Sequence, residues 1–154
     1  MKNLKKIVLT LLTVLMVVGC GSKKETVKID VQETLDTIVS TYYSEMAAGP
    51  YDAEYVESTF GLTAEQYESF AGVYPMITAV ATDIAVFEAK EGKVEEVKAG
   101  VEAYKEYKKQ MAWYPAETEN AENAVIYVNG NYVFFIMASN ASETETYVKS
   151  LFGE

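Results

Sequence analysis

The spacing of apolar residues predicts an amphipathic helix near the start of the chain. Its buried face would consist of residues three or four positions apart, namely Val31, Leu35, Ile38, Val39, Tyr42 and Met46. This spacing places side chains on one face of an α-helix. Asp30 and Glu33 match a capping pair at its first turn. The Ala47-Ala48-Gly49-Pro50 stretch is expected to end it.

A shorter helix and a turn are predicted next. Asp52 can cap a helix that carries Tyr55, Val56 and Phe60 and ends at Gly61. Thr63 and Gln66 form a further capping pair, which is expected to open a short turn that carries Tyr67 and Phe70.

From residue 73 on, the pattern of apolar residues changes from one typical of helices to one typical of strands. Residues 73–80 and 82–88 are rich in apolar and β-branched residues, which predicts two strands connected near residues 79–83. Glu91-Gly92 is a turn, and an apolar stripe over residues 93–111 predicts a long helix with Glu–Lys pairs on its exposed side. Trp113-Tyr114-Pro115 is expected to end this helix.

A second hairpin is the clearest local signal after residue 28. Asn129-Gly130 separates Val125–Val128 from the run Asn131–Met137, and both residues of an Asn-Gly pair tolerate the positive φ of a type I′ turn. Residues 132–137 are apolar at every position, whereas a strand covered on one face would alternate. We therefore expect this strand at the centre of the sheet, with both faces covered. Ser142 with Glu145 predicts the cap of a last helix that buries Val148, Leu151 and Phe152.

Together these elements predict an α+β fold. Two hairpins, each followed by a helix, favour one antiparallel sheet of about four strands with helices packed on it, preceded by an N-terminal helix. Either that first helix or a second copy of the chain would cover the second face of the sheet.

The first twenty residues have the layout of a bacterial lipoprotein signal. Lys2, Lys5 and Lys6 precede an apolar run, Ile7–Val18, and Gly19-Cys20 follows. The run is too short for a membrane span, which needs about 20 residues, and a plain secretory signal would not require the cysteine. The pattern resembles a lipobox, which implies removal of residues 1–19 and a diacylglycerol on Cys20. Residues 20–28 then form the lipidated cysteine and tether, and residues 29–154 a single domain.

The composition restricts the chemistry of that domain. The chain has 13 basic residues, all lysine, against 23 acidic residues, and no histidine. An acidic surface repels nucleic acid and anionic headgroups, so neither is expected as a partner. Because the chain has no histidine and its only cysteine, Cys20, is expected to be lipidated, Ser-His-Asp, Cys-His and zinc chemistry are not expected, and no cofactor is predicted.

Three groups of residues are candidates for function. Trp113 and Tyr114 join two elements and are the best candidates for a binding surface, although the many tyrosines are better explained as core residues with polar edges. Asp83, Glu88 and Glu117 could supply paired carboxylates for glycoside hydrolysis. Asp52, Glu54 and Glu57 could bind Ca²⁺, but the start of a solvated helix explains them better.

Several stretches together resemble a known family. They are the lipobox, residues 82–110, the WYP triplet, and NAVIYVNGNYVFFIMAS. The most specific parts are Asp83–Phe87, Tyr114-Pro115 and Gly130–Val133. The chain resembles the uncharacterised bacterial lipoprotein family known as domain of unknown function 4358, over about residues 29–152. The resemblance implies a protein on the outer face of a single cell membrane, and it implies no activity or catalytic residue.

We therefore expect a lipid-anchored, extracytoplasmic module that binds an envelope protein or peptide and is not an enzyme. The alternative is a small-ligand binder that takes a glycan or peptidoglycan fragment at Trp113 and Tyr114. A carboxylate-based hydrolase is a third, weaker hypothesis.

Overall fold

The computed structural model describes residues 27–77 and 82–154. The predicted signal and lipidation site, together with most of the predicted tether, lie outside the described residues. In the part of the chain that is described, no helix combines the length and the hydropathy needed to cross a membrane.

The described residues form one antiparallel sheet with helices on both faces. The helices are α1 (Val31–Tyr42), α2 (Ala53–Phe60), α3 (Val94–Met111), α4 (Pro115–Glu122) and α5 (Ala141–Ser150). The strands are β1 (Ala48–Pro50), β2 (Tyr67–Pro75), β3 (Asp83–Ala89), β4 (Val125–Asn129) and β5 (Tyr132–Met137). The strand order is β1-β2-β3-β5-β4, and each neighbouring pair is antiparallel. The predicted α+β class is confirmed.

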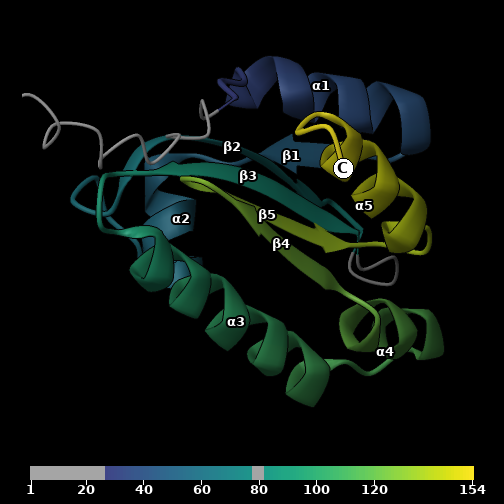
Figure 1. Cartoon of the computed structure of the whole chain (residues 1–154). Helices are drawn as coiled ribbons and strands as arrows, with labels where there is room; N and C mark the ends of the chain where they lie inside the picture. The colour runs from purple at the N-terminus through teal and green to yellow at the C-terminus, as the bar shows by residue number, and fades with distance from the viewer. Residues whose placement is uncertain (1–26, 78–81) are drawn as a thin grey trace, which may run out of the picture.

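The sheet separates two hydrophobic clusters. Figure 1 shows α1 and α5 on one side of the sheet and α2 and α3 on the other, with α4 beside the C-terminal end of α3. The α2–α3 side includes Phe60, Val97 and Phe135, and the α1–α5 side includes Leu35, Phe134 and Val148. The first helix therefore covers the second face of the sheet, as one of the two alternatives predicted.

Strand β5 is covered on both faces, as its unbroken apolar run predicts. All six of its residues are buried. Val133, Phe135 and Met137 belong to the α2–α3 cluster, while Tyr132, Phe134 and Ile136 belong to the α1–α5 cluster. The central position itself belongs to β3, because β5 lies one strand further toward the β4 edge.

The sheet has a fifth strand that the sequence pattern did not predict. Ala48–Pro50, expected only to end the first helix, pairs with residues 73–75 of β2. Three residues carry too little periodicity to identify a strand, and they become one by pairing with β2. Pro50 is compatible with this position, since an edge strand needs no N–H donor on its outer side.

Strand β2 begins six residues earlier than expected and ends at Pro75, so Met76 and Ile77 do not belong to it, and the rest of the predicted strand, residues 78–80, lies outside the described residues. Tyr67 and Phe70 lie in the strand and not in a turn. The turn precedes them, because the Gln66 side chain accepts hydrogen bonds from the backbone N–H and the hydroxyl of Thr63 at 2.9 Å each. The register shifts between Tyr67 and Ser69, and this irregularity obscures the alternation that would have identified the strand.

The β4–β5 hairpin is confirmed, but its two loop residues lie one position later than predicted. Asn129 pairs with Tyr132, so Gly130 and Asn131 are the two loop residues. Gly130 has φ +58°, and no described non-glycine residue has positive φ. A positive φ at the first loop position alone matches a type II′ turn, in which glycine occupies that position. The predicted type I′ turn, centred on Asn129-Gly130, is therefore wrong.

Several helix ends also differ from expectation. Helix α1 ends at Tyr42, before Met46, and α5 has Asn140 at its N-cap position, so Ser142 lies inside the helix. Trp113-Tyr114-Pro115 does end α3, and Pro115 also starts α4. Proline fits this first helical position because its missing N–H would have no partner there.

Two phenylalanines that point to opposite sides of β5 test the two-faced burial. We expect Phe134→Ala and Phe135→Ala each to lower the free energy of unfolding by about 3–5 kcal/mol, because each removes a fully buried ring. Urea denaturation measures this loss. Trp113→Ala is the control, since that side chain is 86 % exposed. A large loss from only one of the two phenylalanine substitutions would mean that one face of the sheet is open.

Candidate functional site

A buried carboxyl group lies at the start of β3. Asp83 shares the α2–α3 side of the strand with Ala85 and Phe87, because side chains alternate along a strand. Its side chain has no exposed surface. The hydroxyl of Tyr51 donates to Oδ1 of Asp83, and the hydroxyl of Tyr104 donates to Oδ2 at 2.6 Å. Both carboxyl oxygens thus have a donor, as a buried acid requires.

Burial and mutual charge change the pKa values of Asp83 and of the tyrosines around it. Burial raises the pKa of Asp83 to about 6, although hydrogen bonds from Tyr104 and Tyr51 and the charge of Lys108 act in the opposite direction. Burial and the charge of Asp83 raise the pKa of Tyr51 well above its usual value. Burial likewise raises the pKa of Tyr55 to about 12. The tyrosines are therefore fixed hydrogen-bond donors at neutral pH.

An open hollow lies on the solvent side of this cluster, between α2 and α3. Its volume is about 390 Å³, and we call it the α2–α3 hollow. It is lined by Tyr55, Ser58, Thr59, Tyr104, Tyr107 and Lys108. Tyr104 connects the two features, since it lines the hollow and also donates to Asp83.

A glycine sets the distance between the two helices. A Cβ atom on Gly100 of α3 would lie 2.6 Å from the carbonyl oxygen of Phe60, the last residue of α2. The backbone carbonyl cannot move aside as a flexible side chain can. The absence of a side chain at Gly100 therefore allows the close approach of α2 and α3 beside the hollow.

A salt bridge links the hollow to the turn between α3 and α4. Lys108 Nζ lies 3.4 Å from Glu117 Oε1, and both side chains are largely buried. The backbone N–H of Trp113 donates to Glu117 Oε2 at 3.1 Å. Partial burial raises the pKa of Glu117, but the Trp113 N–H and the Lys108 charge outweigh it and hold that pKa below its usual value. Glu117 thereby fixes the position of the turn.

The two predicted binding residues lie on this turn, at the surface. Trp113 is 86 % exposed and Tyr114 is half exposed, and the exposed Met111 lies beside them at the end of α3. We call Met111, Trp113 and Tyr114 the aromatic corner. Exposed large apolar side chains in proximity are typical of contact surfaces. Most other tyrosines are packed, including Tyr51, Tyr104 and Tyr132.

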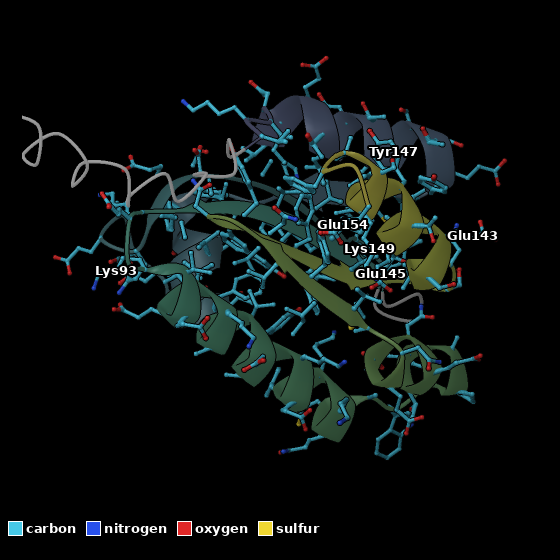
Figure 2. The ribbon with its side chains drawn as sticks, in the orientation of Figure 1. Lys93, Glu143, Glu145, Tyr147, Lys149 and Glu154 are labelled. Atoms are coloured by element: carbon cyan, nitrogen blue, oxygen red, sulfur yellow. The ribbon has the colours of Figure 1, made fainter. Side chains whose placement is uncertain are left out.

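The charged surface of α5 offers no comparable arrangement. Figure 2 shows Glu145, Lys149 and Glu154 near one another on the α5 side of the sheet, away from α3. Lys149 already pairs with Glu145 at 2.7 Å and lies 5.8 Å from the centre of the Tyr127 ring. Glu154 accepts a hydrogen bond from Asn129 at 3.1 Å. These groups therefore serve one another as partners.

The structure does not bring the three candidate carboxylates together. Asp83 and Glu88 lie on opposite sides of β3, and Glu88 accepts hydrogen bonds from Ser69 and Asn131. Glu117 is held by Lys108 and the Trp113 backbone. Glycoside hydrolysis needs two carboxyl groups that face one sugar, and this arrangement does not supply them.

Asp52 lies at the start of a solvated helix, as the sequence pattern predicts. Asp52 caps α2 by accepting a hydrogen bond from the backbone N–H of Tyr55 at 2.7 Å. Within residues 27–77 and 82–154, no three His, Cys, Asp or Glu side chains lie close enough together to hold a metal ion.

The contacts among Asp83, Tyr51 and Tyr104 were missed by reasoning from the sequence. Tyr51 precedes Asp83 by 32 residues, and Tyr104 follows it by 21. The sequence did contain one indication of a buried acid. Asp83 begins an apolar strand and lies on the same side of it as the inward-facing Ala85 and Phe87. An acid at such a position needs buried donors, and tyrosine is the abundant donor in this chain.

Comparison with known proteins identifies the family of the chain. The model of the family described as "Domain of unknown function (DUF4358)" matches residues 41–138, so the chain belongs to that family. The match contains all five strands of the described sheet, the Asp83 cluster and the aromatic corner. No curated protein and no solved structure matches the chain.

Burial of Asp83 should lower the free energy of unfolding as the pH rises. The folded-state pKa of about 6 lies above the ordinary value of 3.8, so the folded chain binds this proton more tightly than the unfolded chain. Its contribution to the unfolding free energy is therefore greatest below about pH 4 and declines as pH rises to about 6. The total decline should be on the order of 2–3 kcal/mol.

Comparison with Asp83→Asn isolates this contribution from that of the other acids. We expect the unfolding free energy of the wild type, relative to that of Asp83→Asn, to fall as pH rises from 4 to 7. Urea denaturation at a series of pH values measures both proteins. Parallel pH dependences would show that Asp83 has the same pKa in the folded and unfolded chains.

Proposed function

We propose that this member of the family is a lipid-anchored, extracytoplasmic binding module of the cell envelope, without catalytic activity. The amino-terminal pattern supports the anchor, since a lysine-rich start, an apolar run and Gly19-Cys20 occur in lipobox order. Two acyl chains on Cys20 would suffice for stable attachment, whereas one gives only marginal binding. The position of the buried acid supports a non-catalytic role, because Asp83 has no exposed surface with which to meet a substrate.

The aromatic corner is the observation that carries the binding proposal. Trp113 and Tyr114 project from a turn that Glu117 holds through the Trp113 backbone, so these side chains are exposed on a fixed support. Aromatic residues and methionine are enriched at protein interfaces, and tyrosine and tryptophan bury large areas there at small cost in conformational entropy. The proposed partner is an envelope protein or peptide with an apolar recess.

The charges around the aromatic corner indicate which charges the partner carries around its apolar recess. Glu119 of α4, five residues after Tyr114, is exposed, and the whole chain carries a formal charge of −10. Opposite charges at the rim of an interface accelerate association and exclude partners of like charge. We therefore propose a partner with basic residues around its apolar recess.

A small-ligand binder is the second candidate, and the α2–α3 hollow is the observation that favours it. Hydroxyl-bearing side chains line a space of about 390 Å³ near the corner. Ligand pockets commonly have volumes of about 300–1,000 Å³. A glycan fragment combines hydroxyl groups with flat faces that stack on aromatic rings, so this arrangement supports the glycan alternative.

Substitution of the lipidation residue tests the anchor. Cys20→Ala should leave an unprocessed precursor or release the protein from the membrane fraction, because no thiol remains for the lipid. Fractionation and mass spectrometry of the mature N-terminus measure both outcomes in cells that express the full chain. A processed N-terminus at a residue other than 20 would contradict the lipoprotein proposal.

Site-specific cross-linking tests the binding surface. A photoreactive phenylalanine analogue in place of Trp113 should cross-link the anchored protein to one envelope partner in native membranes. The same analogue at Glu143, an exposed residue of α5 on the other side of the sheet, is the control. Tyr114→Ala should reduce the Trp113-specific product. Identical products from both positions, or none from Trp113, would contradict a role for the corner.

A further inference from the structure

We infer that the α2–α3 hollow is a binding site for a small hydroxylated ligand that carries a carboxylate, such as a sugar acid. This inference deepens the small-ligand alternative above and rests on it. It assigns that ligand to the hollow instead of the predicted pair Trp113 and Tyr114.

The chemistry of the lining indicates an oxygen-rich ligand. Each of the six lining residues carries a hydroxyl or an ammonium group and none carries a carboxylate, while the Tyr104 hydroxyl donates to Asp83 and the Ser58 hydroxyl donates to the Tyr55 carbonyl. Hydroxyl groups both donate and accept hydrogen bonds, and lysine donates up to three. A ligand rich in hydroxyl and carboxylate oxygens matches these groups.

The tyrosine rings provide a surface for a flat sugar face. The Tyr104 and Tyr107 rings lie 6.5 Å apart with an angle of 24° between their planes. Tyr107 is 56 % exposed, whereas Tyr104 is buried and held by its hydrogen bond to Asp83. The floor of the hollow is thus rigid, and its outer ring is accessible. Because the floor is rigid, little conformational entropy is lost there when a ligand binds.

Lys108 gives the hollow its preference for an anion. It is the one cationic residue of the lining, and its Nζ lies 3.4 Å from Glu117 Oε1. At that distance the bond to Glu117 is long for a charge-assisted hydrogen bond, which is normally about 2.7–2.9 Å. The ammonium group therefore has donors to offer a ligand carboxylate. Glu117 and the buried Asp83 each offset part of the Lys108 charge, whereas exposed acids further away act weakly, because salt screens exposed charges beyond about 8 Å.

Three matched probes test the ligand class. Glucuronate has the ring and the carboxylate, glucose has only the ring, and acetate has only the carboxylate. Each is titrated into ¹⁵N-labelled protein that comprises residues 20–154 with Cys20→Ala and is expressed without residues 1–19, and amide chemical shifts are followed. We expect glucuronate to shift the amides of Ser58, Thr59, Tyr107 and Lys108 with millimolar affinity. Glucose and acetate should bind several-fold more weakly.

Variants locate the site. Lys108→Gln should weaken glucuronate binding about ten-fold, the scale of one lost charge-assisted bond. Lys109→Gln, its exposed neighbour on α3, should bind as the wild type does. Since Lys108→Gln leaves Glu117 without its cation, Tyr107→Ala gives a second test, because that exposed side chain contributes little to the core. It should also weaken binding.

The outcomes distinguish this inference from the proposed function. No shifts at the hollow with any probe would overturn the inference, and so would equal binding by the Lys108 and Lys109 variants. Shifts confined to Trp113 and Tyr114 would overturn it too, and would favour a glycan site at the corner. Trp113→Ala should leave glucuronate binding unchanged, while the cross-linking of a protein partner depends on the corner alone.

Discussion

The burial of β3 and β5 on both faces is the constraint on which the rest of the structure depends. These two strands pair along their length, and their side chains alternate between the two hydrophobic clusters. A sheet with two apolar faces is stable in water only when both are covered. The chain therefore needs helices on each side, and α1 with α5 and α2 with α3 provide them. The hollow exists because α2 and α3 share one face of this sheet.

The parts of the fold with strong local patterns could be predicted from the sequence. The apolar run of β5, the stripe of α3 and the Asp52 and Asp30 caps each lie within one element. Other features depend on distant pairing. Strand β1 has only three residues and is a strand because it pairs with β2. The position of the turn at Gly130 depends on which residues of β4 and β5 pair. Such features require the assembled sheet.

The same distinction applies to the candidate site. The exposure of Trp113 and Tyr114 follows from their position between two helices, so local sequence indicates it. The Asp83 cluster joins β3 to Tyr51, the residue that follows β1, and to Tyr104 in the third turn of α3. Its members share no spacing in the sequence. Among three candidate acids, only packing against the tyrosines distinguishes Asp83 from Glu88 and Glu117.

A buried acid that is costly to ionise is an unusual choice for a position that an apolar residue could fill. Asp83 differs from such a residue because it orients two hydroxyl groups, and one of them belongs to a residue that lines the hollow. A leucine would leave the Tyr104 hydroxyl to find another partner, and the ring would be held by its contacts with Phe60 and Phe135 without the hydrogen bond. The acid thus exchanges stability for a fixed ring, and fixed rings are useful where a ligand is bound. The buried carboxyl group of Asp83 is thus connected to the hydroxyl-lined hollow through Tyr104.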